Sequence, residues 1–192
     1  TREKLGFHSD DFILVFGGNM GIPQNLSNVI MLANEVRETE KIKFLFIGKG
    51  METNKLIGLA ANLGLSNVVF LERVERKVYE SLMLTCDVGL VSLSPKFSIP
   101  NFPSKTMDYI KFNLPILAAL DKSALADYGD FIENSAKVGL CCDAENMEMY
   151  KKNLLRLYED KSLYKLLASN CDKAFKEYFN IATNYEKIVA CL

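Results

Sequence analysis

The sequence predicts an α/β fold: an open parallel sheet of about six strands, with helices on both faces and a helical C-terminal tail. Short apolar runs alternate with stretches of helical periodicity, and the connections between them are short. A strand that is apolar throughout is typical of a parallel sheet, whose strands are covered by helices on both faces. Alternation through short loops also favours right-handed crossovers within a single sheet.

The composition fits one globular domain. The chain has 192 residues, of which 49% are apolar and 24% are charged, and its formal net charge is −1. This length allows a single sizeable core, and the near-neutral charge does not favour a nucleic-acid partner. No apolar run reaches the ~20 residues that span a bilayer, and the amino terminus does not resemble a signal peptide. We therefore expect a cytoplasmic protein with one domain, residues 1–192, in which 143–192 form the tail.

Cysteine and histidine usage limits the kinds of site. The five cysteines lack the spacing of a metal site, and the adjacent Cys141 and Cys142 are typical of strand residues in a reducing compartment. The single histidine, His8, is expected on the surface at the edge of the domain. A histidine base, a Ser-His-Asp triad or a two-histidine metal site would have to use His8 or be absent.

Two strand–turn–helix units open the chain. Residues 11–16 form the first apolar run, and residues 43–47 form the second; each stops at a glycine. Between them, Pro23 precedes a helix. Its apolar positions recur on one face, at Leu26, Val29, Ile30, Ala33 and Val36. The helix after the second run covers residues 52–63 and closes at Gly64, a residue type that suits a helix end.

The rest of the chain continues this alternation and then becomes helical. The expected strands are the apolar runs at residues 68–71, 88–93, 116–120 and 138–142. The expected helices are residues 77–84, 104–112 and 124–132, followed in the tail by 145–159, 161–179 and 181–192. The tail helices are amphipathic, so one face of each is expected to pack against other apolar surface.

Ligands of open parallel sheets bind outside the carboxyl ends of the strands. The loops expected there are residues 17–21, 48–50, 72–74, 94–101 and 121–123. The glycines and the helix start of the first loop would let a phosphate approach closely. Its spacing matches neither G-x-G-x-x-G nor the P-loop, so a tight turn without a ligand is an equal alternative.

The fourth loop carries the most chemistry. Ser104 is a candidate helix N-cap, Lys105 stands beside it, and Asp108 lies one turn further into the helix. Free backbone N–H groups and an ammonium favour a phosphate, and the carboxylate could accept hydrogen bonds from sugar hydroxyls. The alternative is a capped helix with a solvated lysine, in which Asp108 only favours the positive end of the helix.

Six motifs in this order resemble those of a known family. They are Phe16-Gly17-Gly18-Asn19, Phe46-Ile47-Gly48-Lys49-Gly50, Asn67-Val68-Val69-Phe70-Leu71, Cys86-Asp87-Val88-Gly89-Leu90-Val91, Pro103-Ser104-Lys105-x-x-Asp108-Tyr109 and Leu114-Pro115-Ile116-Leu117-Ala118. Over nearly its whole length, the chain resembles the C-terminal domain of the family 4 retaining glycosyltransferases. That domain is Rossmann-like, binds the nucleotide-sugar and forms one half of the GT-B fold. The Pro-Ser-Lys form is similar to the branch that builds bacterial capsule and O-antigen polysaccharides.

The resemblance implies a donor site at the carboxyl edge of the sheet. It places the diphosphate at Gly17, Gly18, Asn19, Ser104 and Lys105, the ribose at Asp108, and the base at Arg73 and Val74. Lys105 would supply most of the positive charge, with Lys49 or Arg73 as helpers. An ammonium close to a desolvated diphosphate stabilises it far more than a surface lysine would.

Three positions depart from the family's pattern. Pro100 stands where the first carboxylate of an acidic pair is expected, and Asn19 and Asn25 stand where an arginine and a lysine often neutralise the diphosphate. The diphosphate would therefore depend mainly on Lys105. If the site functions, we expect it to function as a variant of the family's site.

The resemblance also implies a function. It predicts the donor-binding half of a retaining glycosyltransferase that moves a sugar from a nucleotide-sugar, with UDP expected, to a polysaccharide or lipid-linked acceptor. It assigns no certain catalytic residue to this half, and it implies no metal or cofactor. An N-terminal acceptor domain outside these 192 residues is expected, with possible peripheral membrane association through it, and the isolated half is expected to be inactive.

Two other functions stay open from the residues alone. One is half of a GT-B-fold sugar-nucleotide epimerase, which usually needs more titratable side chains than this chain offers. The other is a non-catalytic nucleotide-binding module. The sequence does not distinguish uracil from guanine, and it does not identify the sugar, the acceptor or the oligomeric state.

Overall fold

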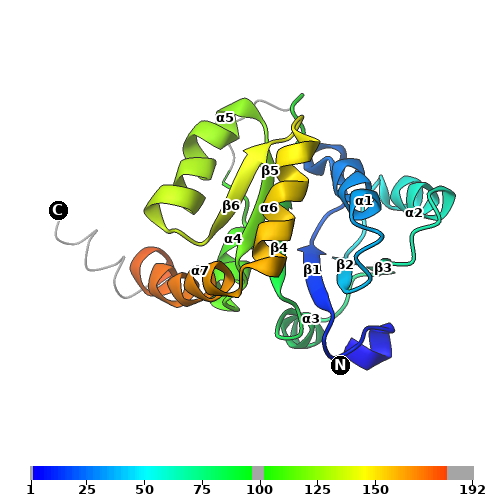
Figure 1. Cartoon of the computed structure of the whole chain (residues 1–192), viewed down its shortest axis with the longest axis horizontal. Helices are drawn as coiled ribbons and strands as arrows, with labels where there is room; N and C mark the ends of the chain where they lie inside the picture. Colours follow the sequence, from blue (N-terminus) through cyan, green and yellow to red (C-terminus); the bar gives the residue numbers. More distant parts are fainter. Residues whose placement is uncertain (1, 97–101, 181–192) are drawn as a thin grey trace.

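Six strands form one parallel sheet in the order β3-β2-β1-β4-β5-β6 in the computed structural model, which describes residues 2–96 and 102–180 (Figure 1). The strands are β1 (Phe12–Gly17), β2 (Ile42–Ile47), β3 (Val68–Leu71), β4 (Val88–Ser92), β5 (Ile116–Leu120) and β6 (Gly139–Asp143). Each lies within one residue of its predicted bounds, so the predicted fold class is confirmed.

The helices agree with the prediction less closely. They are α1 (Leu26–Glu35), α2 (Thr53–Asn62), α3 (Arg76–Met83), α4 (Lys105–Lys111), α5 (Lys122–Ala124), α6 (Met147–Glu159) and α7 (Lys161–Ala174). Short 3₁₀ helices are η1 (Arg2–Leu5) and η2 (Ile22–Gln24), and π-helical turns are η3 (Leu125–Gly129), η4 (Phe131–Ser135) and η5 (Phe175–Phe179). The helix expected at 181–192 lies outside the described residues.

Two helix predictions need correction. The helix expected at 124–132 begins two residues earlier, because the Asp121 carboxylate accepts hydrogen bonds from the Ser123 and Ala124 N–H groups at 2.9 and 3.1 Å. It then continues as the two wider π turns η3 and η4. The helix expected at 161–179 likewise changes to a π turn after Ala174. Apolar periodicity does not distinguish these wider turns from a regular helix.

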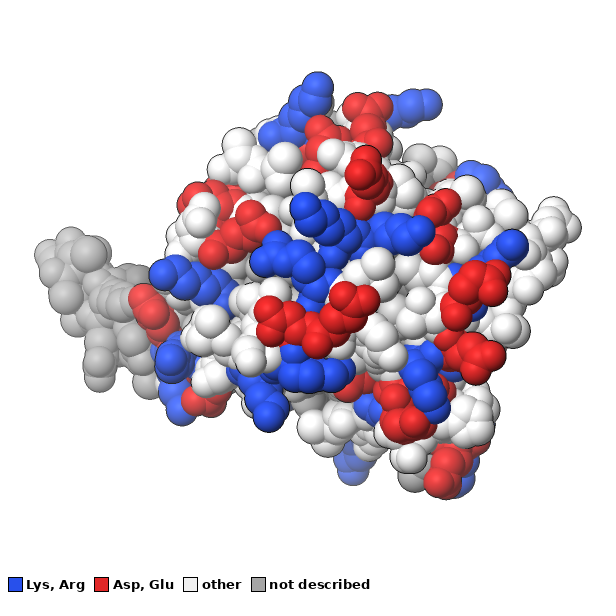
Figure 2. Space-filling view, viewed as in Figure 1, with Lys and Arg blue, Asp and Glu red and all other residues white. Residues whose placement is uncertain are grey.

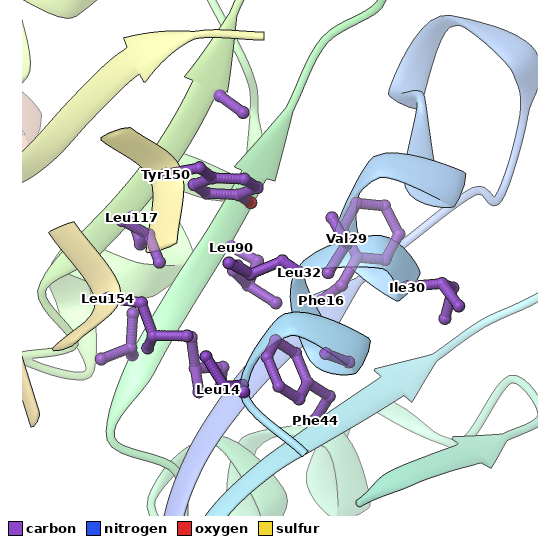
Figure 3. Close-up of a cluster of buried hydrophobic side chains, with 14 of the residues drawn as sticks. Leu14, Phe16, Val29, Ile30, Leu32, Phe44, Leu90, Leu117, Tyr150 and Leu154 are labelled. Carbon is purple, nitrogen blue, oxygen red and sulfur yellow. The ribbon is translucent and has the colours of Figure 1, made fainter. Parts of the chain in front are cut away.

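Two apolar layers enclose the sheet. On one face, α1, α2 and α6 cover side chains of the central strands; Figure 3 shows Phe16 of β1 and Leu90 of β4 in the same cluster as Tyr150 of α6. On the other face lie α3, α4 and the segment from α5 to η4. Helix α7 belongs to both layers: Leu167 packs in the first, whereas Cys171 packs in the second. Helices α6 and α7 are therefore an integral part of the core.

The central pair of strands separates toward the carboxyl edge. β1 pairs with β2 at six positions but with β4 only at Leu14–Val88 and Val15–Gly89. Beyond this point the hydroxyl of Tyr109, from α4, lies between the strands. It accepts from the Gly17 N–H at 3.4 Å and lies within 3.2 Å of the Val15 and Leu90 carbonyl oxygens, to either of which it can donate. The sheet's order reverses between these strands, which is where such sheets open a crevice.

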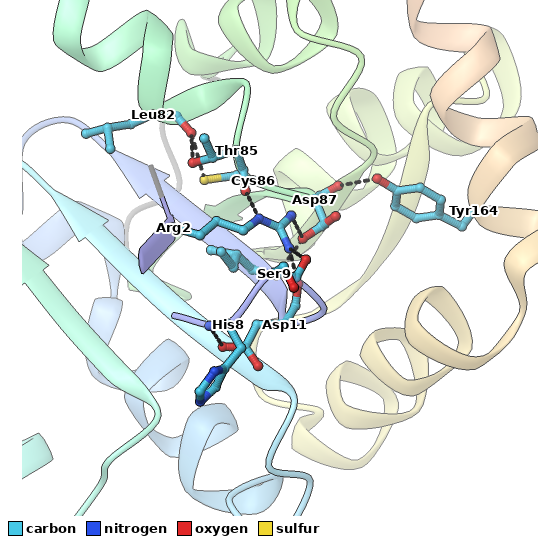
Figure 4. A network of polar contacts seen from close by, with 10 residues as sticks. Arg2, His8, Ser9, Asp11, Leu82, Thr85, Cys86, Asp87 and Tyr164 are labelled. Carbon is cyan, nitrogen blue, oxygen red and sulfur yellow. Dashed lines mark hydrogen bonds and ion pairs between the residues drawn. The ribbon is translucent and has the colours of Figure 1, made fainter. Parts of the chain in front are cut away.

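Arg2 and Asp87 close the opposite, amino-terminal edge (Figure 4). The Asp87 carboxylate accepts from the Ile13 N–H at 2.8 Å and from the Arg2 guanidinium at 2.9 Å. Tyr164 of α7 donates to the Asp87 carbonyl at 3.1 Å, so the tail is also tied to this edge. His8 is exposed here, as predicted, and lies at the opposite edge from the crevice.

β6 forms one edge of the sheet, and side chains satisfy its outward-facing backbone. The Cys141 N–H donates to the Glu133 carboxylate at 2.9 Å, and the Cys141 carbonyl accepts from the Asn153 amide at 3.0 Å. Such pairing protects an edge strand from joining another sheet. Cys141 and Cys142 are buried and unbridged, as the prediction of strand residues requires.

Figure 2 views the face of the molecule that carries α1 and α6. On that face, basic and acidic side chains are intermixed (Figure 2). Among the described residues, no helix is both long enough and apolar enough to cross a bilayer.

Replacing Tyr109 with Phe is expected to lower the free energy of unfolding by about 1–3 kcal/mol, because buried backbone groups lose their partner. Urea denaturation would measure the loss. Tyr164→Phe is the matched control, since it removes a single half-buried hydrogen bond. A loss for Tyr109→Phe no larger than that for Tyr164→Phe would contradict a special role for Tyr109.

Candidate functional site

A cavity of about 900 Å³ lies at the carboxyl edge of the sheet. The ends of β1 and β2, the loop after β3, the start of α3 and the start of α4 form its walls. Its lining residues are Gly17, Gly18, Asn19, Ile47, Gly48, Lys49, Arg73, Val74, Arg76, Tyr79, Ser104, Lys105, Met107 and Asp108. The structure thus brings together all eight residues that the sequence analysis placed at a donor site. The volume of the cavity suits a ligand of nucleotide size.

Two glycine loops form one wall of this cavity. A Cβ added to Gly48, whose φ is +139°, would lie 2.0 Å from the Gly18 carbonyl oxygen. The Gly18 N–H in turn donates to the Ile47 carbonyl at 2.9 Å. Gly18 itself has a φ of +133° and open space beside its Cα. The loops can approach each other this closely because both positions lack a side chain, and the open side of Gly18 exposes backbone to a ligand.

Lys105, the first residue of α4, is the dominant cation of the site. Its ammonium donates to the Gln24 side-chain oxygen at 2.7 Å and lies 4.8 Å from the centre of the Phe16 ring. Burial lowers its pKa from 10.5 to about 8. Across residues 2–96 and 102–180, no carboxylate lies within ion-pair distance of it. Lys105 is therefore partly withdrawn from solvent.

Ser104 does not act as the expected N-cap. The helix begins directly after it, but its backbone is already helical (φ −57°, ψ −28°) and its side chain makes no capping hydrogen bond. A capping residue needs an extended backbone, so that its oxygen can turn back toward the first N–H groups. The preceding residues already form a turn, in which the Thr106 N–H donates to the Pro103 carbonyl at 3.0 Å. Ser104 remains exposed at the cavity wall.

Asp108 is held by an arginine that the sequence analysis missed. Arg76, at the start of α3, donates to both carboxylate oxygens of Asp108, at 2.9 and 3.3 Å. Its Nε donates to Glu80 at 3.0 Å, and these two carboxylates raise the pKa of Arg76. The sequence analysis began this helix at residue 77 and assigned Arg76 no role. The only available signal was the i, i+4 spacing of Arg76 and Glu80, which does not point to the cavity.

The loop after β3 contributes two residues to the cavity wall. Arg73 is exposed and Val74 is half-buried, and both line the cavity. Tyr79, which was not predicted, extends the wall: its hydroxyl would lie 2.4 Å from a Cβ on Gly17. Burial and the nearby Asp108 carboxylate raise the pKa of Tyr79 to about 12, so its hydroxyl stays protonated at neutral pH.

Of the three positions that depart from the expected pattern, the structure describes Asn19 and Asn25. Asn19 is exposed at the cavity. Asn25 has a left-handed backbone with a φ of 43° at the start of α1, a conformation that asparagine tolerates well. Its carbonyl accepts from the Ser92 hydroxyl at 3.2 Å, and it is not among the lining residues. Pro100 lies outside the described residues. In the part of the chain described, no group of three or more His, Cys, Asp or Glu side chains could hold a metal ion.

This arrangement suits a ligand with an anionic end and a polyhydroxyl centre. Near Lys105, a buried ammonium and bare glycine backbone can hold an anion without a further desolvation cost for the lysine. One helical turn away, Asp108 offers carboxylate oxygens to hydroxyl donors. The loop at Arg73 and Val74 would then lie beside the remaining, uncharged part of such a ligand.

One family model and one curated protein match most of this chain. The family model described as "Glycosyl transferases group 1" matches residues 1–174. The chain is 25% identical over 147 residues to WcaI of Escherichia coli (strain K12). WcaI is named as a "Putative colanic acid biosynthesis glycosyl transferase". That match covers 77% of this chain but 35% of WcaI, so the chain spans about a third of this curated relative.

Solved structures share the fold at low sequence identity. Alr3699/HepE of Anabaena, in complex with UDP and glucose, is 17% identical with a TM-score of 0.78, and the match covers 99% of this chain and 50% of that one. The C-terminal domain of a group 1 glycosyl transferase (LpcC) from Francisella tularensis is 13% identical with a TM-score of 0.74. That match covers 93% of this chain and 91% of the other.

Replacing Lys105 with Met is expected to stabilise the empty protein at pH 7 by on the order of 1–3 kcal/mol, because it removes a buried charge without a counter-ion. The lysine's penalty is complete below about pH 8 and disappears as the pH rises toward 10.5, where the unfolded chain also loses its proton. The gain in unfolding free energy should therefore shrink over this window.

Urea denaturation of both proteins from pH 7 to pH 10 would measure that difference. Lys111→Met, at the exposed end of the same helix, is the control and should show no such trend. A gain for Lys105→Met that is independent of pH would contradict the depressed pKa.

Proposed function

The chain belongs to the group 1 glycosyl transferases, and from this premise we propose that it is the donor-binding half of an enzyme that transfers a sugar from UDP-sugar to a glycan acceptor. The observation that carries the proposal is Lys105: a largely buried ammonium that faces a cavity of nucleotide size without a carboxylate partner among the described residues. Such a group costs stability unless an anion binds to it. We assign that anion as the donor diphosphate.

In the transfer step, the bond between the sugar's anomeric carbon and the diphosphate oxygen breaks, and negative charge builds up on the diphosphate. Lys105 would stabilise that charge strongly, because its ammonium is already withdrawn from water. The backbone at Gly18 and the exposed Asn19 would supply further donors to the phosphate oxygens. We propose that Lys105 takes the role that a divalent cation has at other diphosphate sites, so that neither a metal ion nor a cofactor is needed.

We assign the other parts of the donor to other residues that line the cavity. Asp108 would accept hydrogen bonds from the ribose hydroxyls, and main chain at Arg73 and Val74 would contact the base. The UDP in the HepE complex supports uridine as the nucleoside. The transferase is favoured over a sugar-nucleotide epimerase or a non-catalytic module because the matched family is one of glycosyl transferases.

The acceptor side lies outside these residues in our proposal. The chain covers 35% of WcaI and 50% of HepE, which supports a second domain that binds the acceptor and completes the catalytic site. The name of WcaI supports a cell-surface polysaccharide as the product. We propose that such a domain carries any peripheral membrane association, and that this half alone binds donor but does not catalyse transfer.

Lys105→Met is expected to weaken UDP binding by about 30-fold or more, since removal of a charged partner of a desolvated anion costs at least ~2 kcal/mol. Calorimetric titration would measure the affinity, with Lys111→Met as the control for lost surface charge. GDP and ADP titrations would test the assignment of the base. No UDP binding at millimolar concentration, or binding unaffected by Lys105→Met, would refute the proposed function.

The affinity for UDP is also expected to fall as the pH rises above about 8. Free Lys105 loses its proton near that pH, whereas a bound diphosphate raises its pKa, so binding requires proton uptake. The expected slope is about tenfold per pH unit until the pKa of the bound form is reached. The Lys105→Met protein provides the reference, because its affinity should not change over this interval.

Asp108→Ala is expected to weaken UDP binding by about five- to thirtyfold, since the ribose loses one or two charge-assisted hydrogen bonds. Binding of inorganic pyrophosphate should be unchanged by Asp108→Ala but reduced by Lys105→Met. Calorimetry with both ligands would separate the ribose contact from the diphosphate contact. Equal losses for UDP and pyrophosphate in the Asp108 variant would argue against a ribose role.

A further inference from the structure

Arg76 occupies the open edge of the Asp108 carboxylate. Two guanidinium nitrogens donate to the two carboxylate oxygens, at 2.9 Å to Oδ1 and 3.3 Å to Oδ2. The Asp108 side chain is 19% exposed, so little of it is open apart from the side that Arg76 covers. Both residues line the same cavity as Lys105. The contact is therefore part of the binding site itself.

A carboxylate can accept one paired fork of donors on the open edge between its two oxygens. A guanidinium presents two parallel N–H groups in this geometry. The two adjacent hydroxyls of a ribose present a similar pair of donors at a similar spacing. Arg76 and a ribose diol would therefore compete for the same edge of Asp108, and both cannot hold it in this way at once.

Arg76 can release Asp108 without losing all its partners. Its side chain is 58% exposed, and its Nε already donates to Glu80 at 3.0 Å, one turn further along α3. Glu80 is also paired with Lys111 at 3.2 Å, which keeps its carboxylate close to the site. A guanidinium that turns away from Asp108 would remain paired with Glu80 and in water, so its release costs little.

We propose that Arg76 is an internal competitor of the donor: it holds the edge of Asp108 that the ribose diol takes, and the entering nucleoside displaces it onto Glu80. This inference rests on the proposed function, because it takes Asp108 as the ribose-binding group. It adds a charged residue that opposes nucleoside binding to a site in which Lys105 is proposed to favour binding of the diphosphate.

The expected size of the competition is modest. A partly exposed ion pair contributes up to about 1 kcal/mol, so removing Arg76 should tighten nucleoside binding by about two- to fivefold. Loss of its positive charge would act in the opposite direction on UDP, which is an anion. Uridine is neutral and keeps the diol, so it reports the competition without this charge effect.

The experiment titrates uridine and 2′,3′-dideoxyuridine into the wild type and the Arg76→Gln variant, with binding followed by NMR chemical shifts. Lys77→Gln is the matched control, because Lys77 is the exposed neighbour on the same helix. The same substitution is also made in an Asp108→Ala background. UDP is titrated into the wild type and Lys105→Met in parallel.

The proposal expects Arg76→Gln to tighten uridine binding, to leave dideoxyuridine binding unchanged and to have no effect in the Asp108→Ala background, while Lys77→Gln behaves as the wild type. Weaker or unchanged uridine binding in Arg76→Gln would overturn it, since Arg76 would then orient Asp108 or play no part. An equal gain for both nucleosides would also overturn it, because Arg76 would then only obstruct the cavity. Failure of the wild type to bind UDP would instead refute the proposed function, and this inference with it.

Discussion

The hydroxyl of Tyr109 holds the two central strands at the point where the sheet's order reverses. The β1–β4 ladder ends at Val15 and Gly89, and the hydroxyl then contacts backbone of both strands. Gly89 makes room for the ring, since a Cβ there would lie 2.3 Å from it. Because Tyr109 belongs to α4, the same contact sets how Lys105 and Asp108 lie relative to Gly17. The crevice and its charged residues thus depend on one buried side chain.

The two charged groups proposed to bind the donor differ in their partners: Lys105 has no ion-pair partner among the described residues, whereas Asp108 has one. Lys105 is partly buried, with an amide oxygen and an aromatic ring as neighbours, and neither cancels its charge. Asp108, by contrast, is neutralised by Arg76 from a helix 32 residues away in the chain. The empty site therefore has excess positive charge where an anion is proposed to bind, and a covered carboxylate where hydroxyls are proposed to bind. Such a site lowers the stability of the empty protein in exchange for affinity.

Local sequence patterns predicted the strands and the positions of the loops, but not the conformation of individual helix ends. Apolar runs bounded by glycine and proline located the strands, because burial on both faces requires apolar side chains throughout. The loops that carry Gly17 and Arg73, and the helix that begins at Lys105, were expected at the carboxyl edge of the sheet. The carboxyl ends of all strands of a parallel sheet meet at that edge. Ser104 was misjudged as a cap, since capping depends on a backbone conformation set by the preceding turn. The π turns after Leu125 were also missed, because their periodicity is too close to that of a regular helix.

Hydrophobic pattern and chain order were enough to predict the fold class and the edge of the sheet where the cavity lies, and the resemblance in motifs predicted eight of the residues that line it. The burial of Lys105 and the ion pairing of Asp108 could be seen only in the folded structure. Gln24 and Phe16 meet Lys105 from other elements and make it a buried cation, and Arg76 reaches Asp108 from α3. Burial and ion pairing are properties of neighbours in space, and for these groups the neighbours lie 32 to 89 residues away in the chain.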